Sequence, residues 1–347
     1  MRIGLTYNLK PEGAAGDRYE EFDSLETIEA LESALRACDH EPVRLGWGKE
    51  MLEKLAANGG VDGVFNLAEG MGGRGRESQV PATLEMLGIP CTGSDPVAIG
   101  ITLDKALAKL MAKAHGIATA PWRVNPSPGA SRHPLPWGEG SRDAVLPLPW
   151  GEGSRDAVLP LPPGEGRGEG LRFPLFVKPA AEGSSMGVTA KSLCRNEAEL
   201  QDAIARVHAY GAVLIEEYLP GNEYTVGIVD GKAIAVMQVV PKKAQENFFY
   251  SIEVKRQYKE LVEYRLVDEP RVQAVALAIW NAFGLRDVAR VDVRNDRDGV
   301  PNFVEVNPLP GVHPVNSDLV ILAKAAGWTY NQLIAGIMAS AEERWAA

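Results

Sequence analysis

The segment 288–314, VARVDVRNDRDGVPNFVEVNPLPGVHP, combines carboxylate, amide and guanidinium side chains in a pattern that could do chemistry. Its first part alternates apolar and polar residues, NDRDG supplies turn residues, and a second apolar run follows, which predicts two strands joined by a turn. If the strands pair as a hairpin, Asp292, Glu305 and Asn307 converge on one face. Two carboxylates and an amide oxygen are hard ligands that suit Mg²⁺ held beside substrate phosphates.

Arg290 lies two residues before Asp292 and therefore points to the same face of the predicted strand. A fixed cation there suits a phosphate or a developing oxyanion. The alternative for the whole segment is an ordinary hairpin with a polar, solvated face.

Two lysines occur in contexts that suit anion binding. Lys178 ends the apolar stretch FPLFV, and the loop AAEGSSMGVTA at 180–190 follows it. Backbone N–H groups and hydroxyls of such a loop can wrap phosphate oxygens, although no GKS or GKT follows to make it a P-loop. Lys105 lies near the start of a predicted helix at 103–111, where the alternative is a solvated surface lysine.

Composition limits the classes of protein to consider. A chain of 347 residues predicts two or three domains, and 45% apolar with 24% charged residues is typical of globular proteins. The net charge of −10 disfavours a nucleic acid or an anionic membrane as partner. Three scattered cysteines, a strand-like N-terminus and no apolar run of about 20 residues favour a soluble cytoplasmic protein without disulfides.

The first hundred residues alternate strand and helix patterns, which predicts a small parallel α/β sheet. The expected strands are 2–7, 41–45, 61–67 and 89–93, and the expected helices are 25–38, capped by Ser24, 49–58 and 80–87. Loops 9–23 and 68–78 then lie at the carboxyl ends of strands, where such sheets bind ligands. Arg74, Arg76 and Glu77 are candidates to reach a substrate, and a plain flexible loop is the alternative.

The later part of the chain has an α+β pattern. Strands are expected at 121–124, 173–178, 213–219, 223–229 and 232–240, an extended segment at 248–256, and helices at 197–209, 269–283, 317–326 and 330–345. Between the first two strands, residues 134–146, PLPWGEGSRDAVL, are repeated identically at 147–159. The Pro- and Gly-rich stretch 126–170 cannot bury a core, which predicts a flexible surface insertion. The alternative is a Pro-rich recognition segment anchored by Trp137 and Trp150.

Taken together, these motifs resemble the ATP-grasp ligases, and most closely the D-alanine–D-alanine ligase family. The resemblance extends from about Val61 to Ala339, and the matching stretches are LGIPCTGSDP (87–96), LDKALAKLM (103–111), FVKPAAEGSSMGV (176–188), VLIEEYLPGNEYTV (213–226) and RVDV with FVEVNPLPG (290–311). It implies an N-terminal α/β domain at 1–103 and two α+β ATP-grasp subdomains at 104–215 and 216–347. The nucleotide would lie between these subdomains, and the 126–170 insertion would interrupt the first of them.

The resemblance also implies roles for individual residues. Lys105, Lys178 and Lys255 would hold the ATP phosphates, Glu182, Gly183, Ser184, Ser185 and Met186 would cover them, Glu216, Glu217, Tyr218 and Leu219 would read adenine, and Glu223 would bind ribose. Asp292, Glu305 and Asn307 would bind Mg²⁺, and Arg290, Ser184, Glu20 and Gly311 would form the catalytic set. Glu20, Arg256, Ser317 and His313 would contact substrate, although a hydrogen-bonded loop histidine is the alternative for His313.

The implied activity is an ATP-dependent ligase that joins two small amino acids through an acyl phosphate, with D-alanine for both as the leading hypothesis and peptidoglycan synthesis as its context. ATP and two Mg²⁺ ions, with Mn²⁺ as an alternative metal, would be the cofactors. The family is commonly dimeric, which is the only basis for expecting a homodimer.

The amino-acid half departs from the family pattern. Glu20 stands at the position of the N-terminal glutamate only across a loop of altered length, the usual histidine is absent near Glu69, and Arg256 replaces a frequent tyrosine. These departures leave a second hypothesis open, a ligase of the same mechanism for another amino acid or peptide pair. A non-catalytic ATP-binding regulatory protein and a scaffold that acts through the repeat are alternatives of other classes.

Overall fold

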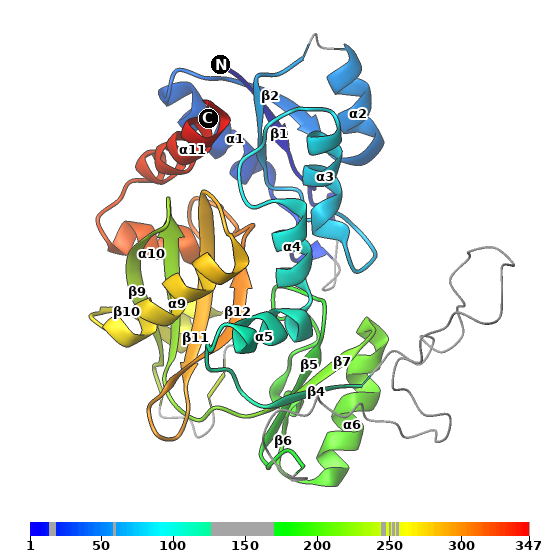
Figure 1. Cartoon of the computed structure of the whole chain (residues 1–347), viewed down its shortest axis with the longest axis vertical. Coiled ribbons are helices and arrows are strands. Elements are labelled where there is room, and N and C mark those ends of the chain that lie inside the picture. Colours follow the sequence, from blue (N-terminus) through cyan, green and yellow to red (C-terminus); the bar gives the residue numbers. More distant parts are fainter. Residues whose placement is uncertain are drawn as a thin grey trace, which may run out of the picture.

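The chain is built around three β-sheets, shown by the computed structural model in Figure 1. The structure describes residues 1–13, 19–57, 60–125, 170–243, 248–249, 251, 254 and 257–346. The predicted insertion at 126–170 lies outside these residues apart from Gly170. Parallel and antiparallel sheets packed with helices confirm the predicted mixed α/β and α+β class. No helix among the described residues is long and apolar enough to cross a membrane.

The N-terminal sheet is parallel, with strand order β2-β1-β3, as the alternation of strands and helices predicted. It contains β1 (Arg2–Thr6), β2 (Glu41–Gly46) and β3 (Gly63–Asn66), with helices α1 (Leu25–Ala37), α2 (Gly48–Ala57) and α3 (Gln79–Met86) and the 3₁₀-helix η2 (Arg76–Ser78). Ser24 caps α1 as expected, since its Oγ accepts the Thr27 N–H at 3.2 Å. The predicted strand at 89–93 is wrong, because only Cys91 forms a single bridge, with Val64.

The region after this sheet contains two helices where the sequence predicted one. These are α4 (Pro96–Leu103) and α5 (Lys105–Ala114). The break falls at Asp104, whose carboxylate accepts the N–H groups of Ala106 and Leu107 at 3.0 Å and so caps α5. Lys105 is consequently the first residue of α5, at a fixed place beside the cap.

The small sheet is antiparallel, with strand order β4-β7-β5-β6. It contains β4 (Trp122–Asn125), β5 (Leu175–Pro179), β6 (Leu193–Cys194) and β7 (Val213–Glu217), with α6 (Glu197–Val207) and the 3₁₀-helices η3 (Ala190–Ser192) and η4 (His208–Tyr210). Leu200, Ile204 and Val207 of α6 are buried against the sheet, as their helical spacing predicted. The predicted subdomain limit at 215–216 falls inside β7, and the domain limits remain predictions.

The large sheet has the order β10-β9-β8-β11-β12. Its strands are β8 (Glu223–Val229), β9 (Lys232–Pro241), β10 (Val262–Val267), β11 (Val288–Asn295) and β12 (Pro301–Asn307), and the helices of this region are α8 (Tyr258–Leu261), α9 (Pro270–Phe283), α10 (Asp318–Ala325) and α11 (Tyr330–Ala346). The predicted hairpin is confirmed as β11 and β12, and its register sets Arg290 opposite Asn307 and Asp292 opposite Glu305. The sequence analysis did not predict β10, which pairs with β9.

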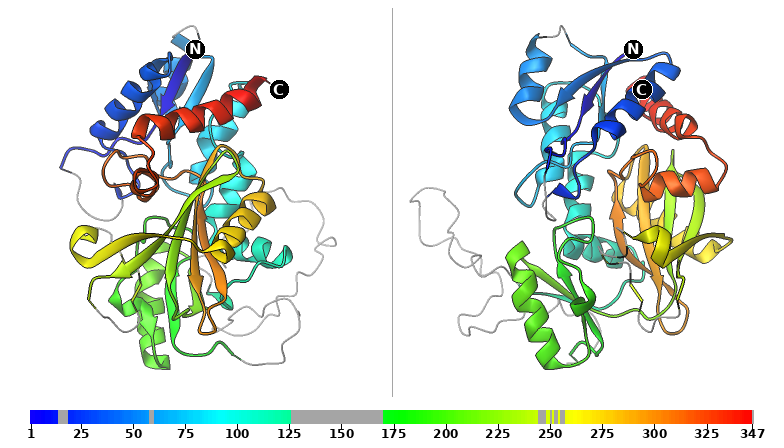
Figure 2. Two further views of the ribbon diagram at one scale, coloured as in Figure 1. Left: turned by 90° about the vertical axis from the view of Figure 1, so that its left-hand side faces the viewer. Right: turned by 180° about the vertical axis from the view of Figure 1, so that it is seen from behind.

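The last helix joins the N-terminal sheet to the large sheet. Figure 2 shows α11 beside α1, so that the two ends of the chain meet on one side of the molecule. One buried cluster contains Ile3, Leu5, Ile28, Leu31 and Leu35 from the N-terminal unit together with Leu319, Leu333, Ile334, Ile337 and Met338 from α10 and α11. This shared apolar core fixes the position of the N-terminal loops relative to the large sheet.

Asp287 also joins the same two units, through hydrogen bonds and an ion pair. Its side chain is buried. Its carboxylate accepts hydrogen bonds from the Gly93 N–H at 2.7 Å and from the Ser340 hydroxyl at 3.1 Å, and it forms an ion pair with Arg344 at 2.6 Å. Three donors from two distant parts of the chain therefore depend on one carboxylate.

Replacing Asp287 by alanine should lower the free energy of unfolding by about 3 kcal/mol, because buried donors lose their common partner. Urea unfolding measures this loss. The control is Asp298→Ala, an exposed carboxylate in the turn between β11 and β12, for which about 0.5 kcal/mol or less is expected. Equal losses of unfolding free energy in the two variants would contradict the proposed role of Asp287 in joining the two units.

Candidate active site

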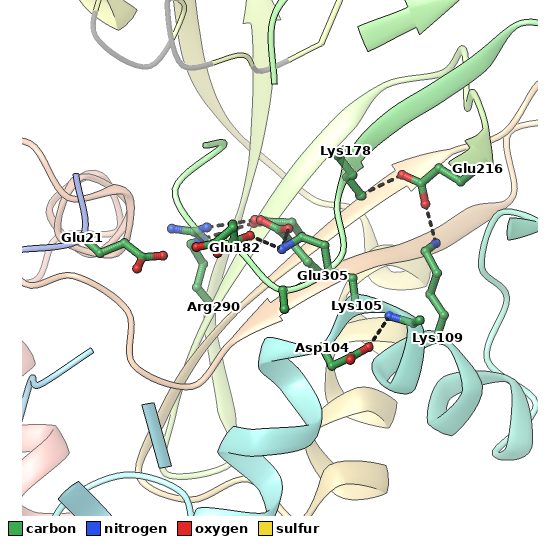
Figure 3. Close-up of polar contacts among 12 residues, drawn as sticks. Glu21, Asp104, Lys105, Lys109, Lys178, Glu182, Glu216, Arg290 and Glu305 are labelled. Carbon is green, nitrogen blue, oxygen red and sulfur yellow. Dashed lines mark hydrogen bonds and ion pairs between the residues drawn. The ribbon is translucent and has the colours of Figure 1, made fainter. Parts of the chain in front are cut away.

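A cleft lies where the small sheet, the large sheet and loops of the N-terminal unit meet. Most of the residues predicted from the sequence line it, namely Lys105, Lys178, Glu182, Gly183, Ser184, Ser185, Met186, Glu216, Glu217, Tyr218, Leu219, Glu223, Arg290, Asp292, Glu305 and Asn307. Figure 3 shows side chains from both sheets and from α5 gathered in this cleft. The structure thus brings residues as far apart in the sequence as Lys105 and Asn307 into one place.

Other predicted residues do not line the cleft. Glu20, Gly311, His313 and Ser317 are absent from its walls. His313 is a hydrogen-bonded loop residue, since its N–H donates to Ser317 Oγ at 2.8 Å and its Nδ1 accepts the Val315 N–H at 3.1 Å. Lys255 and Arg256 lie outside the described residues.

Glu216 lies between two lysines at the small-sheet side of the cleft (Figure 3). Lys178 Nζ is 2.7 Å from one carboxylate oxygen and Lys109 Nζ is 2.8 Å from the other. Burial by itself would raise the pKa of Glu216, but the two ammonium groups outweigh it and lower this pKa to about 2. Glu216 is therefore a permanent anion that holds Lys178 in position.

Lys109 supports the cleft through Glu216, and the sequence analysis did not identify it. Its side chain is only 1% exposed, and its Nζ also donates to Thr119 Oγ1 at 2.7 Å, which in turn donates to the Phe303 carbonyl at 2.8 Å. The chain of contacts links α5 to the small sheet and to β12. Lys109 lies four residues after Lys105, so both lysines share one face of the helix, and this spacing could have identified Lys109 in the sequence.

The β11–β12 hairpin presents two carboxylates and a guanidinium to the cleft. Arg290 pairs with Asp292 at 3.0 Å and with Asp318 at 3.3 Å. Burial raises the pKa of Asp292, Arg290 lowers it and Glu305 raises it again, and the result is a pKa above the usual value. The facing carboxylates Asp292 and Glu305 hence favour additional positive charge between or beside them.

Lys105 connects this hairpin to the Gly/Ser loop. Its Nζ is 3.5 Å from Glu305 and donates to the Glu182 carbonyl at 2.6 Å. Within the loop, Ser184 and Ser185 both have left-handed backbone conformations, with φ of 47° and 56°. Consecutive residues of this kind turn the backbone sharply over the cleft, close to the ammonium group of Lys105.

Arg294 fixes the far end of the cleft. It pairs with Glu223 at 2.9 Å, donates to the Tyr218 hydroxyl at 2.8 Å, and its guanidinium lies 4.8 Å from the centre of the Tyr218 ring. Arg294 follows Arg290 and Asp292 at intervals of two residues in the same strand, and the sequence analysis did not identify it. It holds in place two of the residues assigned to nucleotide binding.

The N-terminal loops form the opposite end of the cleft. Here Glu21 rather than Glu20 lines the wall, and a Cβ on Gly183 would collide with the Glu21 carboxylate. Arg76 pairs with Glu21 at 2.9 Å and donates to the Ala181 carbonyl at 2.9 Å. It therefore connects the loop that carries Glu21 to the Gly/Ser loop.

Of the other two candidates in the second loop, Glu77 lines the cleft and Arg74 instead pairs with Asp104 at 2.6 Å. The resemblance gave the N-terminal substrate glutamate as Glu20, whereas the residue that lines the cleft in this loop is Glu21, one position later.

This arrangement divides the cleft into parts with different chemistry. Lys105, Lys178 and the Gly/Ser loop can bind phosphate oxygens, and Asp292, Glu305 and Asn307 are the residues that could hold a divalent cation. Arg290 lies beside them and can bind a carboxylate. The acidic wall formed by the N-terminal loops faces the same space.

Comparisons with known proteins agree with this geometry. The sequence model described as "D-ala D-ala ligase C-terminus" matches residues 165–339. The chain is 32% identical over 320 residues to a D-alanine–D-alanine ligase of Aquifex aeolicus, covering 91% of this chain and 94% of that protein.

Two solved structures are similar in fold. One is a D-alanine–D-alanine ligase of Bacillus anthracis complexed with ATP, with a TM-score of 0.68, 24% identity and coverage of 100% of this chain and 99% of that one. The other is the VanG D-Ala:D-Ser ligase of Enterococcus faecalis, with a TM-score of 0.66, 17% identity and coverage of 98% and 99%.

The buried pair of Lys109 and Glu216 predicts a large effect of Lys109→Met. Methionine keeps the unbranched apolar stem of lysine but lacks the ammonium group, and so it leaves the Glu216 carboxylate with one cation. The free energy of unfolding measured in urea should therefore fall by about 3 kcal/mol. Lys113→Met, an exposed lysine of the same helix, is the control and should change it by about 0.5 kcal/mol or less. Equal unfolding free energies of the two variants would contradict the structural role of the Lys109–Glu216 ion pair.

Glu77 predicts a pH dependence of stability. Burial, partly offset by Arg76, raises its pKa from 4.5 to about 7. The folded state therefore keeps a proton that the unfolded state has released, and the protein loses stability as pH rises from about 4.5 to 7. Glu77→Gln should relieve this loss, so urea unfolding should show its advantage over the parent protein growing from pH 5 to pH 8. An advantage that is constant or shrinks would contradict the shift.

Proposed function

The chain belongs to the D-alanine–D-alanine ligase family of ATP-grasp ligases, and we propose that it forms a peptide bond between two small amino acids through an acyl phosphate. D-alanine is proposed for both positions, as in the relatives that carry this name. The observation that supports the proposal most directly is the meeting of Lys105, Lys178 and the Gly/Ser loop with Asp292 and Glu305 in one cleft.

ATP fits the part of the cleft between the two sheets. Lys105 and Lys178 lie where its phosphates would bind, and residues 182–186 would cover them. Glu216 to Leu219 would bind adenine along the edge of β7, and Glu223, oriented by Arg294, would accept hydrogen bonds from the ribose hydroxyls. The solved ligase of Bacillus anthracis is itself complexed with ATP, which supports the same ligand here.

The hairpin residues fit a divalent metal ion. Asp292 and Glu305 are register partners, and their mutual repulsion contributes to the raised pKa of Asp292, so positive charge would stabilise both. Asn307 adds an amide oxygen, which already accepts the Leu309 N–H at 3.0 Å and has a second lone pair. These three residues would hold Mg²⁺, with Mn²⁺ as an alternative. The bound ions would neutralise phosphate charge during transfer.

The reaction requires activation of a carboxylate, because a free carboxylate is a poor electrophile. Transfer of the γ-phosphoryl group of ATP to the first substrate gives an acyl phosphate and ADP. The amine of the second substrate then attacks, and phosphate leaves. Arg290, held by Asp292 and Asp318, is proposed to bind the reacting carboxylate and to stabilise the oxyanion of the tetrahedral intermediate. The Gly/Ser loop would exclude water, which would otherwise hydrolyse the acyl phosphate.

The identity of the amino acids depends on the acidic end of the cleft. Buried polar groups discriminate strongly, because a mismatched substrate leaves them unpaired. Glu21 and Glu69 line this end, Arg76 pairs with Glu21, and the similar VanG structure is that of a D-Ala:D-Ser ligase. A ligase of the same mechanism for another pair is therefore the second candidate. The wider roles, in peptidoglycan synthesis and as a cytoplasmic homodimer, are parts of the proposal for the D-alanine enzyme.

The proposal is tested by ADP release with Mg²⁺-ATP and a panel of D- and L-amino acids and short peptides. ADP release that requires D-alanine and is lost in Asp292→Ala is the expected result, because the variant lacks a proposed metal ligand. Asp298→Ala in the same hairpin is the matched control and should retain at least half of the activity.

Turnover with another pair only would keep the mechanism and reject D-alanine. ATP binding without any amino-acid-dependent ADP release would reject the ligase and favour a regulatory ATP-binding protein.

A further inference from the structure

The guanidinium of Arg294 joins three parts of the chain at the nucleotide end of the cleft. Arg294 lies on β11, and the register of the large sheet sets it opposite Glu223 at the start of β8. Its Nη1 donates to the Glu223 carboxylate at 2.9 Å, and its Nη2 donates to the Tyr218 hydroxyl at 2.8 Å and to the Phe248 carbonyl. The Arg294 side chain is only 10% exposed, so these contacts form in a place that is largely closed to water.

The same contacts fix an aromatic wall of the cleft. The Tyr218 hydroxyl donates to the Phe248 carbonyl at 2.8 Å, so Tyr218 and Arg294 share one acceptor. The next residue, Phe249, packs edge-on against Phe176 of β5, with the ring centres 4.9 Å apart. The three rings of Tyr218, Phe249 and Phe176 line the cleft. Arg294 therefore holds both a carboxylate and an aromatic wall at this end.

Glu223 needs such a partner because its surroundings oppose its charge. Burial raises the pKa of Glu223, Arg294 lowers it, Asp292 and Glu305 raise it, and Lys178 lowers it by the smallest amount of these. The guanidinium of Arg294 is the cation in contact with the Glu223 carboxylate, so it holds this acceptor in place against the repulsion of the other two carboxylates.

We propose that Arg294 is a positioning residue that sets the preference of the cleft for ribonucleotides over deoxyribonucleotides, because it holds the Glu223 carboxylate in front of the ribose hydroxyls. This proposal rests on the proposed ATP-dependent function and names the residue on which recognition of the sugar depends. A carboxylate bound to a fixed guanidinium has a defined orientation. A sugar without the matching hydroxyl leaves that carboxylate without its hydrogen bond and is bound more weakly.

The test compares the binding of ATP, 2′-deoxy-ATP and 3′-deoxy-ATP, each with Mg²⁺ and without amino acids, by isothermal titration calorimetry. The parent protein should bind ATP at least about 10-fold more tightly than one of the deoxy analogues, the size of a hydrogen bond to a charged group. In Arg294→Met this preference should fall to about 3-fold or less. Arg294→Gln keeps hydrogen-bond donors but not the charge, and the same loss is expected, so the test does not depend on the folding of one variant.

A second comparison tests whether Arg294 acts through Glu223. Glu223→Gln should itself reduce the preference for ATP, and adding Arg294→Met to it should change the preference by no more than about 2-fold, because the two residues act as a unit. Arg297→Met, an exposed arginine in the turn of the same hairpin, is the matched control and should keep the parent preference. Circular dichroism establishes which variants are folded.

Equal affinity of the parent protein for ATP and both deoxy analogues would overturn the inference while leaving ATP binding in place. The inference would also fail if the folded Arg294 variants bound all three nucleotides more weakly by the same factor, since that result describes a structural role only. Absence of ATP binding to the parent protein would reject the proposed function itself.

Discussion

A buried carboxylate that stays ionised needs positive charge beside it, and the way Glu216 meets this requirement organises the cleft. Its two oxygens contact Lys178 from β5 and Lys109 from α5, so one anion ties the small sheet to the helix that begins with Lys105. Thr119 extends the link to the backbone of β12. Two lysines in one turn of α5 thereby have different tasks. Lys105 lines the cleft at the proposed phosphate site, whereas Lys109 is buried in its ion pair with Glu216.

The two ends of the cleft contrast in their charge balance. At the nucleotide end, each buried charge has a partner of opposite sign, such as Glu223 with Arg294. At the N-terminal end, Arg76 pairs with both Glu21 and Glu77, and Lys105 lies close enough to lower the pKa of Glu77. A balanced end is already in its binding geometry, which lowers the cost of ordering a ligand.

The position of that acidic end is decided by contacts outside the cleft. The N-terminal loops are attached to the N-terminal sheet, which shares an apolar core with α11 and a buried ion pair between Asp287 and Arg344. Residues 91–93 and the C-terminal helix meet at this ion pair, which joins the N-terminal unit to the large sheet that carries Arg290. Glu21 in a loop of the N-terminal unit and Arg290 of the large sheet line the same cleft.

The sequence alone determined those features that depend on neighbours in the chain. The alternation around Asp292 predicted a strand, the turn residues predicted the hairpin, and pairing then required Asp292 and Glu305 to share a face. Ser24 and the α6 spacing were likewise readable, since caps and amphipathic faces are local patterns. Only the tertiary structure decided which lysine is buried, which glutamate faces the cleft and that three loop carboxylates converge. Burial and convergence depend on segments far apart in sequence, and no local pattern records the distance between them.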